Sequence, residues 1–209
     1  SEATIGSWIT LAHPAIAEIM AKAGFDWLVV DLEHSVITIR EAEELIRVID
    51  LCKVVPLVRV SSNDPVQIKR VMDAGAHGVV VPMVNSAAEA KKAVSAVRYP
   101  IKGTRSIGLA RAQGYGSNFN QYLDWVDKEP VVIVQVEHID AVENLEEILS
   151  VNNLDAVFVV PYDLTASMGL TSRFDHEDYK ATIQKVLHLS EEKKIPAGMV
   201  FTGGSPWFN

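Results

Sequence analysis

Residues 23–34 read Ala-Gly-Phe-Asp-Trp-Leu-Val-Val-Asp-Leu-Glu-His, and this stretch decides the fold class. Gly24 follows a segment of helical periodicity, and glycine suits the left-handed residue that ends a helix. The run that begins at Trp27 is short and apolar, as a strand covered on both faces of a sheet must be. It ends in Asp31-Leu32-Glu33-His34. The stretch therefore predicts a helix end, a buried strand and a polar rim.

The same order of helix, glycine or asparagine, and strand recurs at residues 74–77 and 153–155. The predicted strands are Thr4–Thr10, Trp27–Glu33, Val55–Val60, Gly78–Met83, Val131–Glu137, Ala156–Tyr162 and Ala197–Phe201. The predicted helices are Pro14–Ala23, Ile39–Leu51, Pro65–Ala74, Ala87–Val97, Ala141–Val151 and Glu177–Lys193. Such alternation implies a parallel sheet, and seven strands favour a (β/α)8 (TIM) barrel. No Gly-x-Gly-x-x-Gly opens the first helix, which disfavours a dinucleotide-binding fold.

We expect one domain over residues 1–209, because no linker interrupts the pattern. The long irregular stretch Tyr99–Ser117 is rich in glycine and arginine, and ordered loops of this length are often functional. The ending Thr202–Asn209 offers neither an eighth strand nor its helix. We therefore expect the eighth unit of the barrel to be missing from this sequence.

Composition narrows the choice of partners. With 19 Lys and Arg against 27 Asp and Glu, the formal net charge is −8, which argues against a nucleic-acid partner. No apolar stretch reaches the roughly 20 residues of a membrane-spanning helix. The single cysteine, Cys52, excludes an internal disulfide, suits a reducing cytoplasm and is expected to serve packing. We expect a cytoplasmic protein without a membrane partner.

Four polar residues are expected on one rim of the barrel, where active sites of this fold lie: His34, Arg59, Glu137 and Asp163. Glu137 and Asp163 close successive strands, and two converging carboxylates repel unless a cation or a proton lies between them. Mg²⁺ or Mn²⁺ takes such oxygen ligands. The alternative is that both carboxylates are solvated or cap helices, Asp163 at a short helix Leu164–Met168.

The histidine and the arginine make this set more specific. Histidine moves protons near neutral pH, and arginine offers a planar fork of donors to a carboxylate or an oxyanion. A lone histidine at a strand end more often has a structural role. Because Arg59 and two carboxylates are expected on the same rim, a catalytic role is favoured for His34. A Schiff-base mechanism needs a lysine at the barrel mouth. Lys53 precedes a strand and Lys102 lies in the long loop, so we expect no covalent imine chemistry.

At these residues the chain resembles the HpcH/HpaI family of metal-dependent 2-oxo acid aldolases. The resemblance covers residues 4 to about 198. The motifs that carry it are Gly24-Phe25-Asp26-Trp27, Asp31-Leu32-Glu33-His34, Val81-Pro82-Met83-Val84, Gly103-Thr104-Arg105, Val134-Gln135-Val136-Glu137 and Asp163-Leu164-Thr165-Ala166-Ser167-Met168-Gly169. Several ordered motifs are far more specific than one.

The resemblance implies a class II aldolase that joins the enolate of pyruvate, or a similar 2-oxo acid, to an aldehyde, or cleaves that bond. It implies Mg²⁺ or Mn²⁺, with Co²⁺ as a further candidate, held by Glu137 and Asp163. It implies His34 as acid/base and Arg59 on the substrate oxygens, with Pro161, Tyr162 and Asp163 lining the substrate site.

The resemblance further implies that Asp73 pairs with the histidine. Because Asp73 ends a helix at the opposite rim, we expect it to reach a neighbouring subunit of a homo-oligomer, a hexamer or a trimer of dimers; a structural role is the alternative. Arg105 and Arg111 either select an acidic tail of the aldehyde or serve structure.

The chain departs from the family at Val160, where the family has glycine, and a bulkier residue there could disturb a contact to the substrate carboxylate. Two rival functions stay open: a related lyase acting on acyl-CoA esters, as in the citrate-lyase-like branch, and a barrel without catalysis.

Overall fold

The structure of the chain is a computed structural model that describes residues 3–200. The strands are β1 (Gly6–Ile9), β2 (Trp27–Asp31), β3 (Val55–Arg59), β4 (Gly78–Val81), β5 (Val131–Val136), β6 (Ala156–Val159) and β7 (Ala197–Met199). The helices are α1 (Pro14–Lys22), α2 (Ile39–Leu51), α3 (Pro65–Asp73), α4 (Ala87–Val97), the 3-10 helix η1 (Arg111–Gly116), α5 (Phe119–Val126), α6 (Ile139–Glu143), α7 (Leu145–Leu149), α8 (Pro161–Ser167) and α9 (Glu177–Lys193). The fold is therefore α/β.

The strands form one sheet in chain order, β1-β2-β3-β4-β5-β6-β7. The pairings β1–β2, β2–β3, β3–β4, β5–β6 and β6–β7 are parallel. This confirms the parallel sheet that the sequence predicts. Two compact units divide the chain: residues 1–82 with 91–132, and residues 83–90 with 133–209. Each unit is described by itself.

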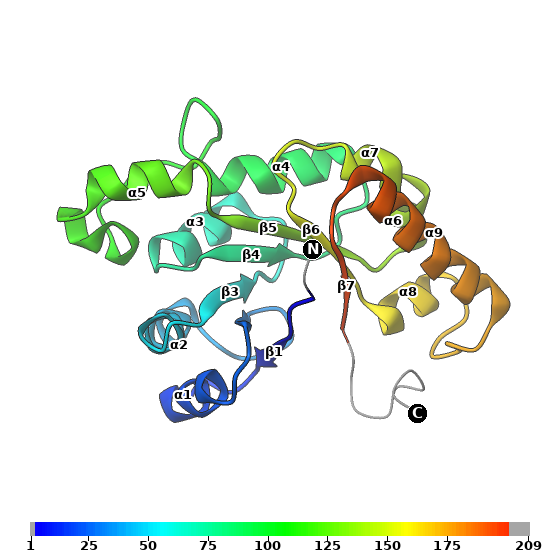
Figure 1. Cartoon of the computed structure of the whole chain (residues 1–209), viewed down its shortest axis with the longest axis horizontal. Helices are drawn as coiled ribbons and strands as arrows, with labels where there is room; N and C mark the ends of the chain where they lie inside the picture. The colour runs from blue at the N-terminus through cyan, green and yellow to red at the C-terminus, as the bar shows by residue number, and fades with distance from the viewer. Residues whose placement is uncertain (1–2, 201–209) are drawn as a thin grey trace. The chain divides into compact units, whose positions relative to one another are not determined.

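The first unit contains β1–β4 and the helices that connect them. Figure 1 shows α1 and α2 side by side, and α2 packs against β2 and β3. Helices start where short polar side chains accept backbone N–H groups: Thr38 forms a capping box with Glu41, and Asp64 caps α3 ahead of Pro65. The side chains of β4 are buried throughout, as a strand covered on both faces requires.

Glycine ends two helices of this unit as expected. Gly24 has φ +94° and Gly75 has φ +101°, conformations that L side chains rarely adopt. At Gly75 space is a second reason, because a Cβ would lie 2.1 Å from Nη1 of Arg111. Any larger residue at position 75 would displace that arginine.

The second unit contains residues 133–136 of β5, the strands β6 and β7, and the helices α6–α9. β5 pairs with β6 from Ile133↔Ala156 to Val136↔Val159, so the carboxyl ends of these two strands lie next to each other. α9 packs against α6, α7 and β7, and Figure 1 shows it beside β7.

Several expected elements were wrong in their details. The sixth strand ends at Val159 instead of Tyr162, because Pro161 starts α8, and proline is well suited to the first helical turn. The helix expected over Ala141–Val151 is two short helices that meet at Asn144. The stretch Tyr99–Ser117 contains η1, and the sequence analysis missed α5. Phe201 and the ending Thr202–Asn209 lie outside the described residues.

None of the helices in the described part of the chain has the length and apolar character needed to cross a bilayer.

Candidate active site

The first polar group of the site lies at the carboxyl ends of β2 and β3. Asp31 and Arg59 are directly opposite in the parallel register. Nε of Arg59 donates to Oδ1 of Asp31 at 2.9 Å, and Nη2 donates to Oδ2 at 2.6 Å. Such a two-pronged pair is stronger and more directional than a single charged hydrogen bond. The register of the sheet therefore fixes the plane of the guanidinium.

Two further contacts hold Arg59. Its Nη1 lies 3.1 Å from Oε2 of Glu33, and its Cζ lies 4.5 Å from the centroid of the Trp8 ring. Trp8 reaches it from β1, where it pairs with Val29, two residues before Asp31. Residues two apart in a strand point to the same face, which explains why the indole meets the guanidinium. Arg59 is thus oriented by two carboxylates and one ring.

Asp31 also builds the turn that carries Glu33 and His34. Its Oδ1 accepts the backbone N–H of Glu33 at 3.0 Å and of His34 at 3.3 Å. Burial alone would raise the pKa of Asp31, but the hydrogen bonds and charge of Arg59, with these two amides, hold the pKa below its usual value. Asp31 is therefore a buried carboxylate that stays charged near neutral pH.

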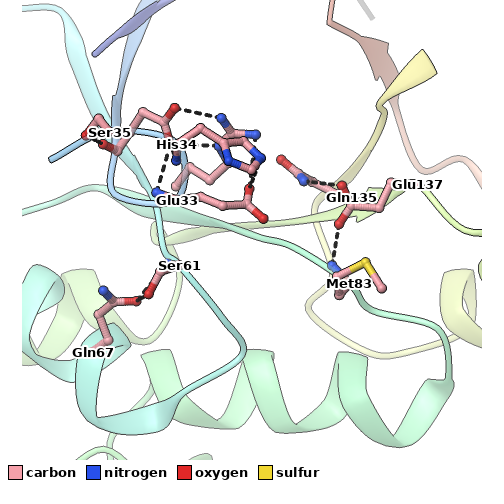
Figure 2. A network of polar contacts seen from close by, with 10 residues as sticks. Glu33, His34, Ser35, Ser61, Gln67, Met83, Gln135 and Glu137 are labelled. Atoms are coloured by element: carbon pink, nitrogen blue, oxygen red, sulfur yellow. Dashed lines mark hydrogen bonds and ion pairs between the residues drawn. The ribbon is translucent and has the colours of Figure 1, made fainter. Parts of the chain in front are cut away.

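His34 occupies the exposed edge of this group, with a side chain 68% accessible. Its Nε2 lies 3.9 Å from Oε2 of Glu33, and Figure 2 shows the two side chains beside each other at the end of β2. The structure thus brings the predicted His34 and Arg59 together through Glu33. Exposure leaves the imidazole accessible to a substrate.

The second polar group lies at the carboxyl end of β5 and is formed by Glu137, Gln135 and the backbone of Met83. Glu137, which follows β5, is 5% exposed. Its Oε1 accepts the backbone N–H of Met83 at 2.5 Å, and its Oε2 accepts Nε2 of Gln135 at 2.8 Å, as Figure 2 shows. Met83 has a φ of +52°, which is uncommon for a residue with a side chain. Strained residues cluster at functional sites, which supports a role for this turn.

Pro161, Tyr162 and Asp163 form the first turn of α8, directly after β6. Asp163 is exposed, and its carboxylate stands at the amino end of a helix, where a negative charge is favoured. Val160 precedes the turn with φ −110° and ψ 97° and is 9% exposed. Its backbone is in the extended region, so this position does not demand glycine, and the valine side chain is buried.

The donor set of the second unit fits a hard divalent cation. Both predicted ligands are carboxylates that follow neighbouring strands, and both oxygens of Glu137 are oriented by hydrogen-bond donors. Within residues 3–200 no group of three or more His, Cys, Asp or Glu side chains is placed to hold a metal ion. A site with two carboxylates, completed by water and substrate oxygens, is the arrangement usual for Mg²⁺.

Asp73 lies elsewhere in the first unit. Its Oδ1 accepts Nη2 of Arg105 at 2.6 Å, and Arg105 is fully buried at its side chain. In the described part of the chain Asp73 pairs with this arginine and not with His34. Nη1 of Arg105 also donates to the hydroxyl of Tyr122 at 2.9 Å. Arg105 therefore has the structural role that the sequence left open as one of two alternatives.

Arg111 likewise serves structure. Its Nη2 donates to Asp50 at 2.7 Å and its Nη1 to the carbonyl oxygen of Ala74 at 3.1 Å, which ties η1 to the ends of α2 and α3. A cavity of about 450 Å³ opens beside this contact, lined by His77 and Trp125 among others. It lies where strand β4 begins.

Sequence reasoning missed four residues that shape the site: Asp31, Glu33, Trp8 and Gln135. Asp31 and Glu33 were visible as polar residues at a strand end. Their common partner, Arg59, lies on the next strand, 28 residues after Asp31, and the sequence alone does not show that contact. Trp8 gave no signal, since an aromatic residue in a strand is ordinary. Gln135 could have been found, because it is a polar residue inside an apolar strand. It lies two positions before Glu137, so its side chain points to the same face of the sheet as that of Glu137.

The chain is similar in sequence to known proteins over most of its length. The model of a family described as HpcH/HpaI aldolase/citrate lyase matches residues 4–203. The chain is 40% identical over 185 residues to the hydroxypyruvate/pyruvate aldolase of Cupriavidus necator, covering 88% of this chain and 68% of that protein. It is 39% identical over 200 residues to a 4-hydroxy-2-oxo-heptane-1,7-dioate aldolase of Escherichia coli, covering 94% and 76%.

A solved structure supports the fold. The crystal structure of an HpcH/HpaI aldolase/citrate lyase family protein from Burkholderia cenocepacia superimposes with a TM-score of 0.90 at 32% sequence identity, covering 95% of this chain and 79% of that one.

Proposed function

Because the chain belongs to the HpcH/HpaI aldolase/citrate lyase family and is a carbon–carbon lyase of the aldolase type, we propose that it joins pyruvate, or a similar 2-oxo acid, to an aldehyde and cleaves the product. The names of two relatives support the donor. One acts on hydroxypyruvate or pyruvate. The other takes a 4-hydroxy-2-oxo acid, whose cleavage between C3 and C4 releases pyruvate.

The observation that carries the proposal is the fixed orientation of Arg59. A guanidinium held by Asp31, Glu33 and Trp8 needs no rearrangement when negative charge develops on a substrate oxygen. Donors oriented before the reaction contribute more to catalysis than donors that must first reorganise. In the proposal Arg59 binds the 2-oxo oxygen as it gains charge.

His34 moves the proton. Enolate formation removes a proton from C3 of the 2-oxo acid, and histidine is suited to that step because its ordinary pKa lies near neutrality. The exposed imidazole is accessible to C3, while its backbone is fixed by Asp31. Addition of the enolate to an aldehyde then needs a proton for the new hydroxyl oxygen, and cleavage reverses both steps.

Glu137 and Asp163 would hold the divalent cation, Mg²⁺ or Mn²⁺ with Co²⁺ as a further candidate. When bound, such a cation supplies Lewis-acid stabilisation of the charge on the 2-oxo oxygen. Met83 and Gln135 orient the carboxylate of Glu137 by one hydrogen bond to each oxygen. The turn Pro161–Tyr162–Asp163 follows the neighbouring strand and lines the substrate site in this proposal.

The proposal extends to assembly and fold. Asp73 is 22% exposed at its side chain and lies at the end of α3. We place it in the site of a neighbouring subunit of a homo-oligomer, a hexamer or a trimer of dimers, with a complete (β/α)8 barrel in each subunit. The expected location stays the cytoplasm, with no nucleic-acid or membrane partner.

A screen for metal-dependent pyruvate release tests the function. Protein dialysed against a chelator is incubated with 4-hydroxy-2-oxo acids of different length, with and without MnCl₂ or MgCl₂. We expect release that requires the metal and is lost in His34→Ala. His188→Ala is the matched control, because His188 is exposed on α9, far along the chain from every site residue. Release that is equal in His34→Ala and the native protein would contradict the proposal.

A further inference from the structure

We infer that Glu33 is a positioning residue that holds the imidazole of His34 during proton transfer, an inference that rests on the proposed function. One oxygen, Oε2 of Glu33, lies 3.1 Å from Nη1 of Arg59 and 3.9 Å from Nε2 of His34. A hydrogen bond from an imidazole N–H needs about 2.7–3.2 Å between heavy atoms. A movement of about 1 Å or less therefore converts this contact into a hydrogen bond.

The surrounding contacts leave the His34 side chain free to make that movement. Asp31 fixes the backbone of Glu33 and His34 by accepting both N–H groups. The His34 side chain is 68% accessible, whereas that of Glu33 is 15% accessible. The carboxylate is thus the fixed partner, and the imidazole is the one that adjusts.

The charges of the group favour a contact between Glu33 and a protonated His34. Asp31 already supplies a full negative charge to Arg59 through two hydrogen bonds. Glu33 brings a second carboxylate to the same guanidinium, so the group of Asp31, Glu33 and Arg59 carries a formal net charge of −1. This surplus charge lies next to His34 and stabilises the imidazolium that exists after the histidine has accepted a proton.

Substrate binding strengthens the pairing. When a substrate oxygen accepts a hydrogen bond from Arg59, it takes up part of the positive charge that faces Glu33. Glu33 keeps its place beside Arg59, but its negative charge is less compensated and attracts the protonated imidazole of His34 more strongly. The imidazole then moves toward Oε2 of Glu33. Within one chain Asp73 pairs with Arg105, so Glu33 is the carboxylate of the same chain that lies beside the His34 imidazole.

A double-mutant cycle tests whether Glu33 acts through His34. Pyruvate exchanges its C3 protons for deuterium in the presence of Mg²⁺ and enzyme, without an aldehyde. We expect Glu33→Gln to lower the kcat of exchange by about 10–100-fold and to change the KM for pyruvate by less than about threefold, because Asp31 still holds Arg59. In the His34→Ala background Glu33→Gln should have no further effect. Multiplicative losses would overturn the inference, as would a KM effect without a kcat effect.

A spectroscopic measurement keeps the inference separate from the proposed function. An imidazole N–H is visible as a low-field proton signal only when a hydrogen bond protects it from exchange with water. With Mg²⁺ and pyruvate present we expect such a signal from His34, absent in His34→Ala and Glu33→Gln. Glu44→Gln, an exposed position on α2, should retain it. A native protein that lacks the signal, or a Glu33→Gln protein that keeps it, overturns the inference, whereas native protein without deuterium exchange contradicts the proposed function instead.

Discussion

Arg59 and Asp31 stand opposite each other on β3 and β2, joined by two parallel hydrogen bonds of 2.9 and 2.6 Å. Lysine at position 59 would keep the charge but lose the planar fork. We expect Arg59→Lys to lower kcat/KM for deuterium exchange by about 10²-fold or more, the usual effect of losing one oriented donor to an oxyanion. Arg47→Lys, at an exposed ion pair on α2, is the matched control. An Arg59→Lys enzyme within threefold of the native rate would refute the assigned role.

The carboxylates of the second unit are predicted to hold one cation between them. Glu137→Gln and Asp163→Asn preserve side-chain shape and remove a charge each, so titration calorimetry should show Mn²⁺ affinity reduced by at least about tenfold in both. Metal-dependent turnover should fall with it. Glu129→Gln, exposed before β5, should bind Mn²⁺ normally. Unchanged affinity in both site variants would remove these residues from the metal site.

The sequence predicted the parallel sheet well because its signals are local. Gly24 and Gly75 mark helix ends through backbone conformation, and the apolar runs of β2 and β4 identify strands buried on both faces. The helix α5 escaped notice because glycine and arginine dominate the segment before it. The length of strand six was overestimated, because the apolar run gives no sign of where the strand ends. Only the structure shows that Pro161 starts α8.

The sequence names candidate site residues but not the contacts between them. Strand ends single out His34 and Arg59 as candidates, because parallel strands present their carboxyl ends on one rim. No local pattern says that Arg59 contacts Asp31, Glu33 and Trp8 at once, since these contacts depend on sheet register. The pairing of Asp73 with Arg105 likewise joins positions 32 residues apart.

His77 should make the fold less stable in mild acid. Burial, opposed by Asp50 and assisted by Arg111, lowers the pKa of His77 below the ordinary 6.5. The unfolded chain therefore binds a proton before the folded protein does, and stability falls as the pH drops through 6.5 toward the folded pKa. His77→Gln should lose less stability between pH 7.5 and pH 5 than the native protein in urea unfolding. His188→Gln, exposed on α9, should follow the native protein, and identical pH dependence in all three would count against the assignment.

The pair of Asp73 and Arg105 separates a structural from a catalytic role. Arg105 is fully buried, donates to Asp73 and Tyr122, and lies 4.8 Å over the Tyr99 ring. Arg105→Met removes one partner of a largely buried ion pair and should cost about 3 kcal/mol of unfolding free energy.

Asp73→Asn keeps an acceptor for Arg105 and should cost about 1 kcal/mol, the usual worth of one hydrogen bond. If Asp73 works in the site of a neighbouring subunit, this variant loses deuterium exchange while its unfolding curve stays close to that of the native protein. Mixing Asp73→Asn with His34→Ala protein, after dissociation and reassembly, should then restore part of the activity, because some interfaces regain both native residues. Asp73→Asn protein with native exchange would leave Asp73 as the partner of Arg105 alone.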